Sequence, residues 1–380
     1  MNKKEVLEIR KQFTPANCAI TRIAGCYVDH EKNKKMESKS AFLSLPEDDA
    51  FKYFDIFRKT LSGSVGKNLL NLEFPTKQEM PGGAQEFLMK LRKSKLEDDQ
   101  LLEEFYDRII ESYNYGENYY IVLIYAMYDI PGRASDGTEM YDASEEVYEY
   151  LLCSICPVSL SKAGLSYHAE SNCIQDRIRD WVVGMPDKGF LFPAFNDRST
   201  DIHGVLYYTK KSEDLQQELI EQLLGARMPM SANTQKEKFQ MLIEDTLGED
   251  GDYKTIRNIH DALNDMIEEH KEEPEPLQLD KADVRKVFEQ SGVSSEKMES
   301  FDQNYEETAG EKTSLLAENI TETKKFQIET PDIVIKVNPG RTDLVDTMVV
   351  NGRKCLVIAV DDSLEVNGIP VRTIERAENE

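Results

Sequence analysis

The longest apolar run of the chain covers Asn118–Pro131, and its centre, Tyr119–Tyr128, holds ten nearly uninterrupted apolar or aromatic positions. This run is too short for a membrane span, which needs about 20 residues. It lacks the three-to-four spacing of a surface helix and is rich in β-branched and aromatic residues, so it predicts a strand buried on both faces. Asp129 comes near its end, where open α/β sheets place functional carboxylates. A turn-forming Asp before Pro131 is the alternative.

The first half of the chain alternates predicted strands and helices around this run. Ser44 and Glu47, and then Ser94 and Glu97, have the spacing of capping boxes that open helices. Residues 172–183 alternate apolar and charged positions, which allows either a strand or a helix. The expected elements are a helix with Val6, Ile9 and Phe13 on one face, a strand at 19–28, a polar loop at 32–40, helices from 47 to about 63, at 84–95, 97–114 and from a cap at Asp142–Glu145 to 152, a strand at 153–160, and a hairpin of 189–195 with 204–209.

The second half changes from helices to strands. Helical periodicity marks 212–225, 234–247, 253–271, 280–291 and 295–308, and the charged, proline-bearing residues 272–276 interrupt it. Two Asn-Gly pairs, Asn351-Gly352 and Asn367-Gly368, predict hairpins in the last fifty residues. The sequence therefore predicts an α+β fold in four parts. These are a mixed-sheet domain over 1–211, a helical segment over 212–273, an acidic linker with helices over 274–330, and a β-hairpin meander over 331–380.

Charge and cysteine content narrow the possible functions. Acidic residues outnumber basic ones by 71 to 46, for a formal net charge of −25. This balance argues against a broad nucleic-acid face, because phosphate binding requires clustered basic side chains. The one local cluster, Lys32, Lys34, Lys35 and Lys39, is either a small basic patch or a solvated loop. Six cysteines without a secretory pattern at the N-terminus indicate reduced thiols in the cytoplasm, and no apolar stretch predicts a membrane anchor.

Four residues form a candidate metal site. Cys153 and Cys156 are separated by two residues, and His168 and Cys173 follow, which provides the Cys₃His ligand set of a tetrahedral zinc site. The alternative follows from the apolar surroundings of Cys153, which favour a small core side chain. Zinc or another divalent ion is the only cofactor that the sequence suggests. The glycine fingerprint of dinucleotide binding does not occur in the sequence. Two segments, at 62–68 and 309–313, are similar to a phosphate-binding loop but depart from its pattern.

A second candidate site lies on the predicted hairpin loop. Asp197, Asp201 and His203 fall within a few residues of one another, and Asp129 belongs to a neighbouring strand. An acid and a histidine together can act as a general base or hold a divalent ion. The alternative is a polar loop in which the carboxylates bind backbone amides.

Several long phrases resemble a known family. They are FTPANCAITRIAGCYVDHEKNKK, FRKTLSGSVGKNLLNLEFP, YDASEEVYEYLLCSICPVSLSKAGLSYHAE, DRIRDWVVGMPDKGFLFPAFNDRSTDIH, IHDALNDMIEEHKEEPEPL and the closing VNGRKCLVI and VNGIPVRTI. They resemble a full-length family of uncharacterised proteins of Gram-positive bacteria, labelled as a domain of unknown function. The resemblance implies a bacterial, cytoplasmic protein and transfers no site residue. The layout of sheet, acidic helices and terminal β unit is also similar to that of the nucleoid-associated NdpA family.

These observations favour a non-enzymatic binding or regulatory protein that acts through a protein partner, because acidic helical faces suit basic partners. The alternative is a nucleoid-associated or nucleic-acid-related protein that uses the lysines at 32–39. A further alternative is a metal-assisted hydrolase built on Asp129, Asp197, Asp201 and His203. The sequence leaves the oligomeric state open.

Overall fold

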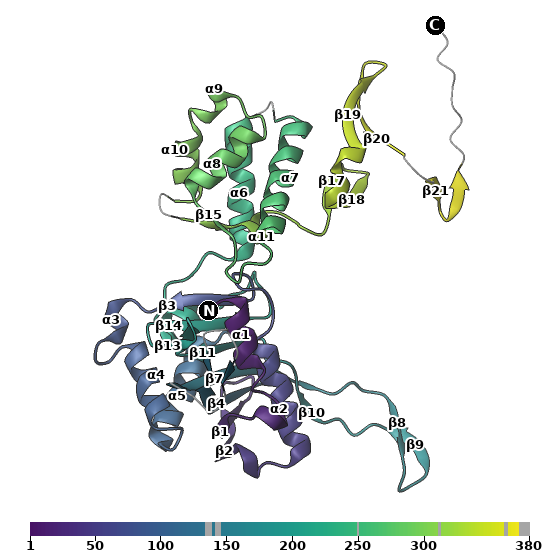
Figure 1. Cartoon of the computed structure of the whole chain (residues 1–380). Helices are drawn as coiled ribbons and strands as arrows, with labels where there is room; N and C mark the ends of the chain where they lie inside the picture. Colours follow the sequence, from purple (N-terminus) through teal and green to yellow (C-terminus); the bar gives the residue numbers. More distant parts are fainter. Residues whose placement is uncertain (134–138, 141–145, 249–250, 311–312, 361–363, 372–380) are drawn as a thin grey trace. The chain divides into compact units, whose positions relative to one another are not determined.

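A computed structural model describes residues 1–133, 139–140, 146–248, 251–310, 313–360 and 364–371 (Figure 1). The chain forms two compact units, Met1–Thr234 with Pro274–Pro276, and Gln235–Glu273 with Leu277–Glu380. Helices and strands both contribute heavily to the structure, which confirms the α+β fold class.

One large sheet organises the first unit. Its strands lie in the order β2-β1-β4-β7-β11-β14-β3, and β10 pairs with β7 beside this path. They are β1 (Ile20–Val28), β2 (Lys34–Ala41), β3 (Leu69–Glu73), β4 (Tyr119–Ile130), β7 (Glu146–Leu160), β10 (Trp181–Val183), β11 (Lys188–Phe192) and β14 (Gly204–Thr209). Every one of these pairs is antiparallel, where the sequence predicts mixed directions. Hairpin-type connections join β1 to β2 and β11 to β14, and such connections reverse the direction of the chain.

Helices cover both faces of this sheet (Figure 1). The first face carries α4 (Ala84–Lys93), α5 (Asp99–Ser112) and the π-helical turn η3 (Leu219–Leu223), and the second carries α1 (Lys3–Arg10) and α2 (Glu47–Thr60). Along β4, Tyr119 and Ile121 pack into the first layer, and Tyr120 and Val122 into the second. Alternating side chains therefore meet apolar surroundings on either side, which confirms the predicted doubly buried strand.

The prediction of a helix that ends at residue 152 is wrong for residues 146–152, which form part of a strand. Strand β7 begins at Glu146 and pairs with β4 from Ile130 opposite Glu146 to Tyr119 opposite Pro157. The predicted cap at Asp142–Glu145 lies outside the described residues. Pairing with the central strand β4 outweighs local helical preference here, because strand propensity depends on the partners that the fold supplies.

Two further local predictions are corrected by hydrogen bonding. The polar segment predicted as a loop is the edge strand β2, whose lysines suit an exposed edge. Helix α2 does begin at Glu47, but the Ser44 hydroxyl donates to Ala41 O instead of capping it. The Ser94 hydroxyl likewise donates to Leu91 O, and Asp98 is the residue that caps α5. In both cases the serine bonds backward along the chain, which removes it from the forward cap.

Short elements complete the first unit. They are η1 (Pro15–Asn17), η2 (Phe42–Ser44), α3 (Thr76–Glu79) and the strand pairs β5 (Gly132–Arg133) with β6 (Glu139–Met140), β8 (Leu165–His168) with β9 (Cys173–Asp176), and β12 (Ala194–Asn196) with β13 (Ser199–Asp201). The β12–β13 pair extends the predicted hairpin beyond β11 and β14. The β8–β9 pair forms the end of an arm that points away from the sheet (Figure 1).

The second unit contains a helical body. Its helices are α6 (Ala232–Leu247), α7 (Tyr253–Glu269), α8 (Lys281–Gln290), α9 (Ser295–Met298), α10 (Phe301–Thr308) and α11 (Ala317–Ile320), and β15 (Gln278–Leu279) pairs with β16 (Leu315–Leu316). Phe239, Leu263, Phe288 and Phe301 are fully or almost fully buried in its interior. The helical spacing of apolar residues within each segment, such as Ile259 and Leu263 on α7, is what predicts these helices.

The last described residues form separate strand pairs. They are β17 (Phe326–Glu329) with β18 (Val334–Val337), β19 (Val345–Val350) with β20 (Arg353–Ile358), and β21 (Leu364–Val366) with β22 (Ile369–Val371), while the short helix η5 (Pro339–Leu344) separates β18 from β19. Asn351 and Asn367 have positive φ, as the turns predicted at both Asn-Gly pairs require. The hairpins form as predicted, but in the described residues each pairs only within itself and no continuous meander results. Within all the residues that the structure describes, no helix is long and apolar enough to cross a bilayer.

Candidate functional site

A groove of about 390 Å³ lies beside the outer end of β4, between that strand and α1. Asp129 lines it as an exposed residue of β4, together with Glu8, Lys11 and Cys18. Burial raises the pKa of the Cys18 thiol, so this sulfur is not an activated nucleophile. The groove therefore presents charged side chains without a primed attacking group.

One ion pair joins this groove to the β12–β13 hairpin. Glu8 accepts hydrogen bonds from the Tyr128 hydroxyl at 2.9 Å and from the Arg198 guanidinium at 3.0 Å, and Arg198 also donates to Pro131 O. Both charged side chains are mostly buried. Arg198 is thus turned toward α1 rather than toward the acids of its own hairpin, and the contact holds the hairpin against the helix.

The predicted carboxylate and histidine site is spread over several local contacts. Asp197 occupies the turn of the hairpin with φ of 51°, and Asp201 accepts from Asn196 Nδ2 at 2.6 Å and from the His203 backbone amide. The His203 imidazole instead meets Glu79 at 2.7 Å, which raises its pKa. Asp201 therefore acts as a turn-forming acid, as the alternative interpretation predicts.

The four residues of the candidate zinc site do not converge. Cys153 and Cys156 are three residues apart on β7, so they point to opposite faces and belong to different core layers. Burial raises the pKa of both thiols, which keeps them protonated. His168 and Cys173 lie opposite each other on the β8–β9 arm. Within the described ranges no three His, Cys, Asp or Glu side chains are grouped to hold one ion.

The lysine cluster of β2 is matched by nearby acids and carbonyls. Lys34 pairs with Asp107 of α5 at 2.8 Å, Lys39 pairs with Asp99, Lys35 pairs with Asp29 at 2.9 Å, and Lys32 donates to Ile110 O. Asp107, Asp99 and Ile110 belong to α5, and Asp29 lies in the turn between β1 and β2. Charges that are already paired attract phosphate less strongly, so the basic patch that was one of the two interpretations of these lysines is largely neutralised.

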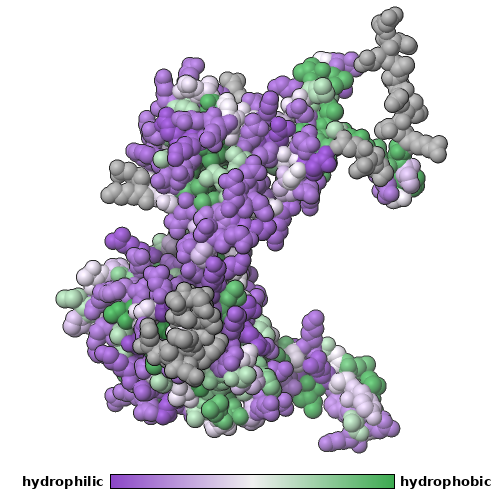
Figure 2. Space-filling model, viewed as in Figure 1, coloured by the Kyte–Doolittle hydropathy of each residue, from purple (hydrophilic) through white to green (hydrophobic). Residues whose placement is uncertain are grey.

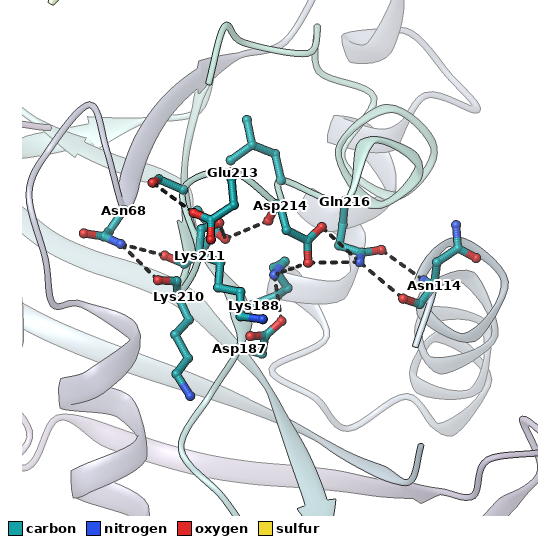
Figure 3. A network of polar contacts seen from close by, with 12 residues as sticks. Asn68, Asn114, Asp187, Lys188, Lys210, Lys211, Glu213, Asp214 and Gln216 are labelled. Carbon is teal, nitrogen blue, oxygen red and sulfur yellow. Dashed lines mark hydrogen bonds and ion pairs between the residues drawn. The ribbon is translucent and has the colours of Figure 1, made fainter. Parts of the chain in front are cut away.

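A buried lysine that the sequence analysis missed lies at the start of β11 (Figure 3). The Lys188 side chain has no exposed surface, and its ammonium meets Asp187 at 2.7 Å and Asp214 at 3.3 Å. Gln216 donates to Asp214 and to Asn114 O, and so extends the network to the end of α5 (Figure 3). The available signal was a lysine that directly precedes an apolar strand and follows an acid. The network holds β11 and the loop that carries Asp214 together. It does not line the groove beside β4.

The arm is the second feature that sequence reasoning missed. Tyr167 pairs with Ile174 across the β8–β9 hairpin, and alternate residues of both strands share that face. Leu165, Tyr167 and Ile174 are 75%, 61% and 62% exposed. Trp181, at the base of the arm, is also more than half exposed. Figure 2 shows hydrophobic surface, in green, on the arm. The alternation within 172–183 was the signal, but it did not distinguish strand from helix.

Taken with these sites, the fold is that of an α+β protein with a helix-covered antiparallel sheet and an exposed β arm. A family model described as Domain of unknown function (DUF4317) matches residues 1–369, and the chain belongs to this family. No curated protein and no solved structure matches the chain. The predicted resemblance to a full-length family of this label is therefore confirmed.

Proposed function

We propose that this chain is a non-enzymatic binding protein whose arm docks on a basic protein partner through the face of Leu165, Tyr167 and Ile174. The exposed apolar face of the arm is the observation that carries the proposal. A two-stranded ribbon is marginally stable by itself in water, and a contiguous exposed apolar face is typical of an interaction site.

The charge of the chain supports a basic partner. The arm over residues 158–183 carries three basic and three acidic residues, whereas the whole chain has a net charge of −25. A neutral apolar arm on an acidic protein suits a partner with an apolar patch set in a positive surface, because opposite potentials increase the rate of encounter. Burying the three apolar side chains supplies roughly 3 to 6 kcal/mol before the costs of association.

The proposal is tested by placing a photo-crosslinking amino acid at Tyr167 or at Ser166 in the full-length chain. These neighbours lie on opposite faces of the arm, so Ser166 is a matched control. Irradiation in cells that make the protein should give a discrete adduct with one basic protein from position 167 only. The yield should fall as salt is added to an extract, and should fall further when Ile174 is replaced by Ser.

Three outcomes would overturn the proposal. They are adducts of equal yield from both positions, no adduct from position 167, and an adduct whose only components are two copies of this chain. The last outcome would assign the apolar face to self-association. The salt dependence separates a basic partner from one held by apolar contact alone, because the steering contribution is screened above about 0.1 M salt.

A further inference from the structure

A cavity of about 410 Å³ opens in the second unit between α6, α7 and the segment from α11 to β17. Small-molecule sites typically have volumes of about 300 to 1,000 Å³. Two helices each turn a pair of polar side chains toward it, Lys236 with Gln240 on α6 and His260 with Asn264 on α7. Residues four apart share one helix face, so both helices present polar strips next to an otherwise apolar core.

The His260 ring has a defined orientation in this cavity. Its Nδ1 lies 3.0 Å from the Thr321 hydroxyl oxygen, and its ring makes edge contacts with Phe239 and Phe326 at centroid distances of 6.5 and 6.3 Å. Burial lowers the pKa of His260, and the nearby charge of Lys236 lowers it further. The imidazole is therefore neutral near pH 7, and its Nε2 is the ring atom left to contact a ligand.

Asn264 contributes a side-chain amide to the lining of the cavity. Its Oδ1 is buried and has no hydrogen-bond partner within the part of the chain that the structure describes. Leaving such an acceptor unsatisfied costs about 1 to 3 kcal/mol. An asparagine amide presents a donor and an acceptor side by side, which matches the edge of a heteroaromatic ring such as a nucleobase.

The mouth of the cavity is charged. Lys236 and Lys325 are exposed there, and neither makes an ion pair with another described residue. Glu322 and Glu329 also line the mouth, and Glu329 accepts a hydrogen bond from Gln327 at 3.0 Å. The two ammonium groups can therefore receive an anionic group, while the aromatic wall of Phe326 lies farther in.

We propose that this cavity binds a small ligand that combines a planar heteroaromatic ring with an anionic group, the chemistry of a nucleoside monophosphate. The ring lies against Phe326 with its edge on Asn264 and His260, and the phosphate lies between Lys236 and Lys325. Aromatic stacking and edge hydrogen bonds are the usual means of holding single bases. This inference concerns the second unit and does not depend on the proposed role of the arm.

The test uses the full-length chain and the Cε1–H resonance of His260, assigned by its loss in His260→Gln. Adenosine monophosphate, uridine monophosphate and inorganic phosphate are titrated at constant ionic strength. One of the nucleotides should shift the resonance saturably, and phosphate alone should bind at least about tenfold more weakly. Asn264→Leu should weaken nucleotide binding at least about tenfold, because the ring edge loses its amide partner.

A second variant and a control keep the test independent of folding defects. Lys236→Ala combined with Lys325→Ala should weaken nucleotide binding but leave binding of the uncharged nucleoside unchanged. Lys254→Ala, at an exposed position on α7 outside the cavity, should change neither. The proposal is overturned if neither nucleotide shifts the resonance, if phosphate binds as tightly as the nucleotides, or if the control weakens binding as much as the double variant.

Discussion

Replacing Lys188 with Met should destabilise the first unit more than any surface lysine change. Methionine is one heavy atom shorter than lysine, so the substitution keeps most of the side chain and removes its charge at a site with no exposed surface. Asp187 and Asp214 then lose their shared cation, which lay 2.7 and 3.3 Å away. Breaking a buried ion pair costs about 3 to 5 kcal/mol. Since these carboxylates are 17% and 44% exposed, water replaces part of the loss, and we expect about 2 to 4 kcal/mol.

The measurement is urea unfolding, with hydrogen exchange of the β11 and β14 peptides to assign the transition to the first unit. Lys210→Met is the matched control, because Lys210 is a neighbouring exposed lysine, and it should change the free energy of unfolding by less than about 0.5 kcal/mol. Combining Lys188→Met with Asp187→Asn should recover part of the lost stability, because the carboxylate that has lost its cation is then neutral. Equal stability of the Lys188 and Lys210 variants would refute the reasoning.

Three further predictions concern the same unit. Gly25→Ala should cost about 1 to 3 kcal/mol in urea unfolding, because a Cβ there would lie 2.0 Å from the Tyr120 hydroxyl oxygen. The pKa of His203, followed by NMR, should lie above 6.5 because Glu79 stabilises the imidazolium; its contribution to stability is then complete below about pH 6.5 and is lost as pH rises through the folded pKa. Cys173, an exposed thiol of the arm, should react first with a disulfide reagent in the native protein.

Each of these has a control within the chain. A Cβ added at Gly116 meets no atom within 4 Å, so Gly116→Ala should leave the free energy of unfolding nearly unchanged. A loss of stability as large as that of Gly25→Ala would contradict the steric explanation. Glu79→Gln should return the histidine pKa toward 6.5, and an unchanged titration would exclude the ion pair as its cause. Cys153 and Cys156 should react only on unfolding, since burial raises the pKa of both. Fast labelling of either would show that the sheet core is open.

Local patterns predicted those elements whose neighbours play little part in forming them. The hairpin turns at Asn351 and Asn367 were predicted from two residues each, because the positive φ of such turns is a local requirement. The amphipathic stripe of α7 likewise needs only its own spacing, as the burial of Ile259 and Leu263 shows. The first residues of strand β7 have a sequence that predicts a helix, and they form a strand because β4 pairs with them, which their own sequence does not reveal.

The candidate sites were harder to predict than the elements, because a site depends on where side chains point. The spacing of Cys153 and Cys156 suits a metal on a turn, but on a strand the same spacing sends the two thiols to opposite faces. Arg198 lies next to Asp197 in the chain and yet bonds Glu8, 190 residues away. Neither outcome follows from spacing until the type and partners of the element are known.

The sequence by itself determined the α+β class, the central strand and the terminal hairpins, because each depends on apolar periodicity or on backbone requirements of a few adjacent residues. Only the tertiary structure decided that Lys188 lies buried between two acids, that Lys34 and Lys39 of β2 are paired with α5, and that the arm is left uncovered. These features depend on contacts between distant segments. An ion pair depends on which charged side chains lie close together in space, and that is fixed only when the sheet brings distant segments together.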